Sequence, residues 1–122
     1  MNPKYIDTHT HTNFAVFDED RKEVIQNTLN NNTWLINVGT QKDTSQKAID
    51  IAEQYDEGVY AIVGLHPIHT NDSFHDEDEL GEGNTTFSSR GEVFDTTYYK
   101  QLATHEKVVG IGETGLDYFR LE

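Results

Sequence analysis

Apolar runs and helical patterns alternate along this chain, and the alternation constrains the fold more than any other feature. Four short runs have the character of strands: residues 5–6, 34–38, 59–63 and 108–111. The last three are nearly continuous in apolar and β-branched residues, which is typical of strands buried on both faces of a sheet. We therefore expect a parallel sheet covered by helices.

Three segments with helical spacing lie between these runs. The positions that share one helical face are, in chain order, Val24, Ile25, Thr28 and Leu29; Ala48, Ile49, Ile51, Ala52 and Tyr55; and Tyr98, Tyr99, Leu102 and Ala103. Asp43 and Gln46 form a candidate capping box for the second helix, and Asp95 or Thr96 is a candidate N-cap for the third. This alternation predicts right-handed crossovers and the α/β class.

The composition fits one globular domain with an acidic surface. The chain has 122 residues, 34% of them hydrophobic, and a formal net charge of −13. The absence of cysteine excludes a disulfide framework, a thiolate metal site and a cysteine nucleophile. No apolar run approaches the roughly 20 residues of a membrane span, and the first residues lack a signal-peptide pattern. We therefore expect a cytoplasmic protein with no membrane partner.

One long stretch, from about residue 68 to residue 95, breaks the alternation. It holds many acids and several glycines and shows no convincing period. A connection of this length is usually functional or disordered. We expect residues 68–91 to be mobile or to hold little regular structure, because few of their side chains can anchor them in a core.

The first strand is followed by a run that suits metal binding. Asp7, His9 and His11 alternate with threonines, and side chains two apart on an extended segment project from one face. Two imidazoles on one face can bind a single divalent cation, and nitrogen donors suit Zn²⁺ or a neighbouring transition metal. Parallel α/β folds place their sites at this end of a strand, so we interpret the run as a candidate metal site.

Two further strand ends carry residues that can take part in chemistry. Glu113 follows the fourth run and is flanked by glycines. Its carboxylate is a candidate ligand for one metal or a bridge between two, although taken alone it fits an incidental acid in a turn slightly better. His66 follows the third run, and Pro67 holds it extended. Parallel strands end on one side of a sheet, so we expect Glu113 and His66 to face the histidine pair.

Taken together, the three strand ends carry His-x-His, Gly-Leu-His-Pro and Gly-Glu-Thr-Gly-Leu-Asp in that order. In this respect the chain resembles the TatD family of metal-dependent hydrolases, within the amidohydrolase-like group of barrels. The resemblance extends from Ile6 to Arg120 and includes residues 34–39 and 117–120.

The resemblance implies a (β/α)₈ barrel of the TIM type, of which this chain carries the first four strands and three helices. It also implies a deoxyribonuclease that uses two divalent metal ions, Zn²⁺, Mn²⁺ or Mg²⁺. By resemblance, His9 and His11 are metal ligands, and Glu113 is both catalytic and a bridge between the metals. His66 is a catalytic-site residue that contacts the substrate, and Asp7 and Asp117 have supporting roles.

The chain also departs from the family pattern. The family's other ligands, two histidines and an aspartate that serves as general base, belong to later strands, and this chain has about half the length that such a barrel needs. We therefore expect residues 1–122 to be a single partial domain, the N-terminal half of a barrel, in which the acidic stretch is an insertion. The open strand edges of such a half-barrel favour self-association, aggregation or loose packing.

The substrate stays open at this point. Either DNA or a small phosphodiester fits the resemblance, and the charge of −13 argues that DNA binds weakly. A related amidohydrolase-type enzyme acting on an amide, an ester or a cyclic phosphate is the first alternative. The second is a truncated, non-catalytic module that binds metal or another protein.

Overall fold

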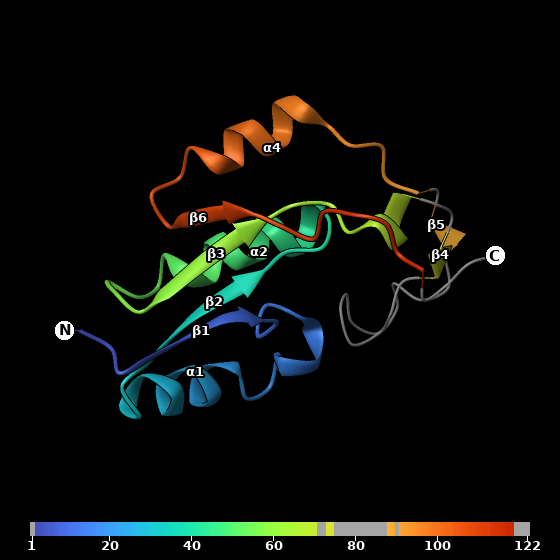
Figure 1. The fold of residues 1–122 in the computed structure, drawn as a ribbon. Helices are drawn as coiled ribbons and strands as arrows, with labels where there is room; N and C mark the ends of the chain where they lie inside the picture. Colours follow the sequence, from blue (N-terminus) through green and yellow to red (C-terminus); the bar gives the residue numbers. More distant parts are fainter. Residues whose placement is uncertain (1, 71–72, 75–87, 90, 119–122) are drawn as a thin grey trace.

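The computed structural model describes residues 2–70, 73–74, 88–89 and 91–118. Four of its strands form one parallel sheet in the order β1-β2-β3-β6. These strands are β1, Tyr5–Thr10; β2, Thr33–Val38; β3, Val59–Val63; and β6, Val108–Ile111. The three α-helices of the described residues are α1, Arg21–Asn30; α2, Lys42–Ala52; and α4, Thr96–Ala103. This confirms the predicted α/β class, and the arrangement fits the first part of a TIM barrel (Figure 1).

Short elements occupy the connections. A 3₁₀ turn, η1 (Ala15–Phe17), lies between β1 and α1, and a second, η2 (Pro67–Thr70), follows β3. Two-residue strands, β4 (Ser73–Phe74) and β5 (Ser88–Ser89), pair antiparallel within the acidic stretch. Most of residues 71–90 lie outside the described part, so the mobility of this stretch stays a prediction. None of the helices in the described part has the length and apolarity that crossing a membrane requires.

The core lies between the sheet and its helices, in two clusters of buried side chains. The first contains Ala48, Ile49, Ala61, Val63, Leu65, Tyr99 and Leu102. The second contains Ile25, Leu35, Ile51, Ala52 and Val59. Helix α2 contributes to both clusters, so it is the central cover of the sheet. Each fully buried Leu, Ile or Val side chain contributes about 1.5–3 kcal/mol relative to exposure.

Helix α2 begins at a capping box, but not at the predicted one. The side chain of Gln41 accepts from the backbone of Thr44, and the side chain of Thr44 accepts from the backbone of Gln41. The predicted pair, Asp43 and Gln46, lies two residues further along, inside the helix. The prediction was wrong because the first helical residue is Lys42, which the apolar spacing of the helix does not reveal.

Helix α4 is capped and anchored by two carboxylates. Asp95 Oδ1 accepts from the backbone N–H of Tyr98 at 3.0 Å, which confirms the predicted N-cap. Glu92 accepts from the hydroxyl of Tyr99 at 2.7 Å and from the backbone N–H of Lys42 at 3.0 Å. The same carboxylate therefore joins α4 to the first turn of α2, where the helix dipole favours a negative charge.

The outer strands are more exposed than the central ones. Val109 and Ile111 of β6 are 53% and 54% exposed, and Tyr5 and Ile6 of β1 are 60% and 52% exposed. Within the described residues, β1 pairs with β2 alone and β6 with β3 alone, so both are sheet edges. The prediction of burial on both faces is wrong for β6, because an apolar run records hydrophobicity and not whether a neighbour covers it.

Candidate metal centre

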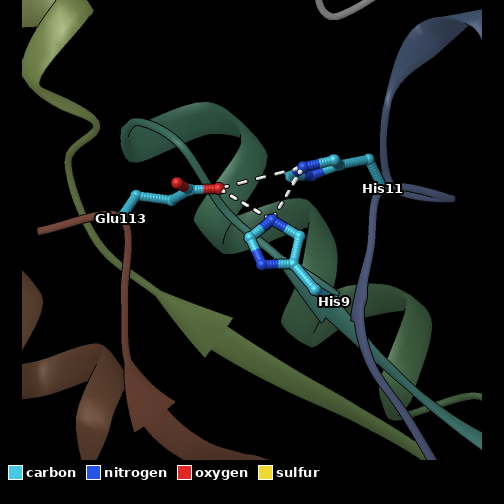
Figure 2. A group of neighbouring side chains, drawn as sticks. All are labelled: His9, His11 and Glu113. Carbon is cyan, nitrogen blue, oxygen red and sulfur yellow. Dashed lines mark hydrogen bonds and ion pairs between the residues drawn. The ribbon is translucent and has the colours of Figure 1, made fainter. Parts of the chain in front are cut away.

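Three side chains from the two outer strands converge at the carboxyl end of the sheet (Figure 2). Glu113 Oε1 lies 3.1 Å from His9 Nε2 and 3.8 Å from His11 Nε2, and the two imidazole nitrogens are 3.2 Å apart. His9 belongs to β1 and His11 follows it directly, whereas Glu113 comes two residues after β6. The predicted proximity of residues more than a hundred positions apart in the chain is therefore confirmed.

The three donor atoms fit one divalent cation. Bond lengths of about 2.0–2.1 Å to a tetrahedral ion place neighbouring ligand atoms roughly 3.3–3.4 Å apart. The observed separations of 3.1, 3.2 and 3.8 Å lie around that value, so small side-chain shifts suffice. Two nitrogens and one carboxylate oxygen suit Zn²⁺ or a neighbouring transition metal, and three protein ligands leave a position open for water or substrate, as in catalytic sites.

A β-bulge shapes the histidine run. Asp7 pairs with Leu35 and Thr10 with Asn37, so β1 has one residue more than β2 over this interval. The extra residue interrupts simple alternation between Asp7 and Thr10, and Asp7 is not among the three side chains whose ligand atoms converge. Its carboxylate Oδ1 accepts from the backbone N–H of His9 at 3.2 Å. The sequence predicted that Asp7 would orient an imidazole, whereas this hydrogen bond holds the backbone of the bulge.

His11 is the imidazole that its surroundings orient. Its Nδ1 lies 2.9 Å from the carbonyl oxygen of Val38. A carbonyl can only accept, so Nδ1 carries the hydrogen and Nε2 presents its lone pair toward Glu113. The ring also stacks on Phe14, with centroids 4.4 Å apart and an interplanar angle of 20°. The sequence analysis missed both supports, because neither residue belongs to a recognisable ligand pattern.

His66 lies beside the same carboxylate but has the opposite tautomer. The backbone N–H of Ile68 donates to His66 Nδ1 at 3.0 Å, so the hydrogen of the neutral ring is on Nε2. That Nε2 is 3.9 Å from Glu113 Oε2. His66 therefore faces the site, as predicted, and it offers an N–H donor rather than a lone pair.

Close packing of glycine backbones brings the last two strand ends together. A Cβ on Gly64, after β3, would overlap the carbonyl oxygen of Gly112, after β6. A Cβ on Gly112 would in turn overlap the side chain of Ile62. Glu113 itself has φ 58°, in the left-handed region. This turn follows directly on the close packing of the glycines and gives the backbone from which the Glu113 side chain reaches the histidines (Figure 2).

Asp117 is not one of the three side chains whose ligand atoms converge. It is half-buried in the segment after Glu113. Its supporting role stays a prediction.

Two histidines and a carboxylate at the carboxyl end of a parallel α/β sheet form a candidate site for a divalent metal ion. Residues 6–122 match the family described as TatD related DNase, and the chain belongs to this family. The chain is also 34% identical over 113 residues to "Uncharacterized metal-dependent hydrolase YabD" of Bacillus subtilis (strain 168). The match covers 92% of this chain and 37% of that relative.

Proposed function

We propose that the complete protein hydrolyses phosphodiester bonds with the help of divalent metal ions, in the manner of a deoxyribonuclease. The convergence of His9, His11 and Glu113 carries this proposal. It supplies a donor set for a catalytic cation at the edge of the sheet where such sites lie. Membership of a family described as TatD related DNase supports the phosphodiester as the bond cleaved.

The two oxygens of Glu113 support a site for two ions. Oε1 faces His9 and His11, whereas Oε2 faces the direction of His66 at 3.9 Å. His9, His11 and Oε1 would hold one ion, and Oε2 would be available to a second ion, which could be Zn²⁺, Mn²⁺ or Mg²⁺. Bound ions polarise a phosphoryl oxygen and lower the pKa of a coordinated water.

His66 would bind and orient the substrate in this proposal. Its Nε2–H can donate to a non-bridging phosphate oxygen, because its Nδ1 is already occupied by the N–H of Ile68. A neutral donor held by the backbone needs no change of protonation to perform this task. This assignment matches the substrate contact that the resemblance implies for His66.

The acidic charge favours a small substrate or a weakly held one. The formal net charge of −13 repels a polyanion at long range, and two divalent ions offset only four charges locally. We therefore propose that a small phosphodiester is turned over at least as well as a DNA strand. The name of the Bacillus subtilis relative specifies a metal-dependent hydrolase but not the bond, so an amide or ester substrate is the second candidate.

The test uses the complete protein with Mn²⁺ or Zn²⁺ and three substrates: bis(p-nitrophenyl) phosphate, a single-stranded oligodeoxynucleotide and p-nitroacetanilide. We expect cleavage of the first two and none of the third. If the protein cleaves the anilide and neither phosphodiester substrate, the proposal that it hydrolyses phosphodiester bonds is wrong. The match covers 37% of the Bacillus subtilis relative, and the resemblance implies further ligands in the remainder of such proteins, so we expect residues 1–122 alone to bind metal but to turn over poorly.

A matched pair of histidine variants ties activity to the site. His11→Asn removes a ligand, and we expect at least a hundredfold loss of kcat/KM. His105→Asn is the control, because His105 pairs with Glu53 at 2.8 Å on the surface and is not part of the convergent group. Equal activity of both variants would contradict the proposed site.

A further inference from the structure

Arg21, the first residue of α1, binds the loop that follows the histidine run. Its side chain is only 15% exposed. Nε donates to the carbonyl of Thr12 at 2.5 Å, and Nη2 donates to the carbonyl of Phe14 at 2.9 Å. Nη2 also lies 2.6 Å from Asp18 Oδ1. One guanidinium therefore fixes two backbone carbonyls and a carboxylate of a single loop.

This loop also contacts His11, through the face of its ring. The ring of Phe14 stacks on the imidazole, and the backbone N–H of Phe14 donates to the carbonyl of His11 at 3.0 Å. The plane of the imidazole therefore depends on where the backbone of Phe14 lies. Arg21 holds that backbone through the Phe14 carbonyl.

We propose that Arg21 is a positioning residue for the metal centre, which acts on His11 through Phe14. The inference rests on the metal site proposed above. Arginine suits the task better than lysine, because its planar, rigid fork of donors can bind several acceptors in a fixed geometry. A lysine ammonium is a point charge on a flexible stem and does not reproduce this arrangement.

The ion pair between Arg21 and Asp18 can be tested separately from the hydrogen bonds that Arg21 donates to the two carbonyls. Lys47 Nζ lies 2.9 Å from Asp18 Oδ1, and the hydrogen bonds from Lys47 and Arg21 lower the pKa of the Asp18 carboxyl. Asp18 touches neither Phe14 nor His11 in any described contact. Removing its charge therefore disturbs the ion pairs and leaves the bonds from Arg21 to the two carbonyls in place.

The experiment compares three forms of the 122-residue chain: wild type, Arg21→Met and Asp18→Asn. Zn²⁺ affinity is measured by competition calorimetry. The tautomer of His11 is read in the metal-free protein from the ¹⁵N chemical shifts of its ring. For Arg21→Met we expect about a tenfold loss of affinity and a His11 signal that moves from the Nδ1–H form toward a mixture. For Asp18→Asn we expect affinity within twofold of wild type and an unchanged tautomer.

Two results with Arg21→Met and Asp18→Asn would overturn the inference. One is wild-type affinity and tautomer in Arg21→Met. The other is an equal loss in Asp18→Asn, which would show that the effect is one of charge or general stability. Arg21→Lys is expected to behave like Arg21→Met, and full rescue by lysine would equally contradict the need for the fork.

A second variant covers the case in which Arg21→Met does not fold. Phe14→Leu removes the stacked ring and leaves the backbone carbonyl and its bond from Arg21 intact. We expect the same change of His11 tautomer and a similar loss of affinity, and wild-type behaviour of this variant would overturn the inference. If the wild-type chain binds no Zn²⁺, the metal site itself fails, whereas the metal-free ¹⁵N spectra still decide whether Arg21 positions His11.

Discussion

The central strands β2 and β3 differ from the outer strands β1 and β6 in both burial and chemistry. Leu35, Val59 and Val63 on the central strands are at most 1% exposed, whereas Ile6 and Ile111 on the outer strands are more than half exposed. All three convergent ligands nevertheless come from the outer strands or the residues just after them. In this molecule the packing free energy lies in the centre of the sheet and the candidate chemistry lies at its edges.

A cation bound at the candidate site would connect the two strands that lie at opposite edges of the sheet. β1 and β6 are the first and last strands in the order β1-β2-β3-β6, with two strands between them. The side chains of His9, on β1, and Glu113, two residues after β6, come within 3.1 Å of each other. Metal binding would therefore add a connection between edges that backbone pairing does not provide. The predictions below test this division between centre and edge.

The largest expected difference is in stability between the centre and an edge. Leu35→Ala on β2 should lower the free energy of unfolding by about 2–5 kcal/mol, because it leaves a cavity among buried neighbours. Ile111→Ala on β6 should cost less than about 1 kcal/mol, since that side chain is 54% exposed. Urea unfolding followed by circular dichroism measures both. Similar losses would show that the edge is as well packed as the centre.

The second expected effect is stabilisation by metal. Zn²⁺ at a hundred times its dissociation constant should raise the free energy of unfolding by about 2.7 kcal/mol, because only the folded chain assembles the site. Glu113→Gln should lose this gain, since it removes the only charged ligand among the three. Glu53→Gln, at the surface pair with His105, is the matched control and should keep the gain. Thermal unfolding with and without Zn²⁺ makes the comparison.

The third effect concerns association through the edges. Among the described residues, β1 and β6 each pair with one strand only, so their outer edges and the exposed Val109 should make the chain self-associate. Val109→Lys should weaken this association at least tenfold, which corresponds to about 1.4 kcal/mol. Val93→Lys, at an 85% exposed position outside the strands, should leave it unchanged. A wild-type chain that sediments as a monomer at high micromolar concentration would contradict this expectation.

The smallest effect is at Tyr99, which packs in the core with Ala61 and Val63 of β3. Burial, and then the Glu92 carboxylate, raise the pKa of the Tyr99 hydroxyl above its ordinary value of 10.0. The neutral hydroxyl is therefore favoured by folding, so its contribution is full below pH 10 and is lost as the pH rises further. Tyr99→Phe should cost about 1 kcal/mol at neutral pH. The stability of wild type should fall faster than that of the variant in alkaline urea titrations.

Much of the fold could be predicted from the amino-acid sequence. The apolar runs locate all four parallel strands, and the helical spacing locates α1, α2 and α4. The positions of His9, His11 and Glu113 follow from one physical rule, because parallel strands end on the same side of a sheet. Periodicity cannot tell a central strand from an edge strand, whereas the open edges expected of a half-barrel do account for the exposure of Val109 and Ile111.

The groups that hold His11 in place, and the bulge in β1, could not be predicted from the sequence. The carbonyl of Val38 orients His11 through a backbone group, which any residue type would supply. Phe14 and Arg21 act through a loop whose path depends on tertiary contacts. The bulge between Asp7 and Thr10 depends on the pairing of β1 with β2, which the sequence of β1 alone does not specify.

The left-handed backbone of Glu113 places stability and function in opposition. A non-glycine residue at φ 58° carries a conformational cost of about 1–3 kcal/mol, which glycine would largely avoid. Glu113→Gly should therefore bring a partial compensating gain in folding while it removes the carboxylate from the metal centre. A sequence optimised for thermal stability alone would tend to replace this residue. A glutamate at such a position is expected where its side chain is required for function.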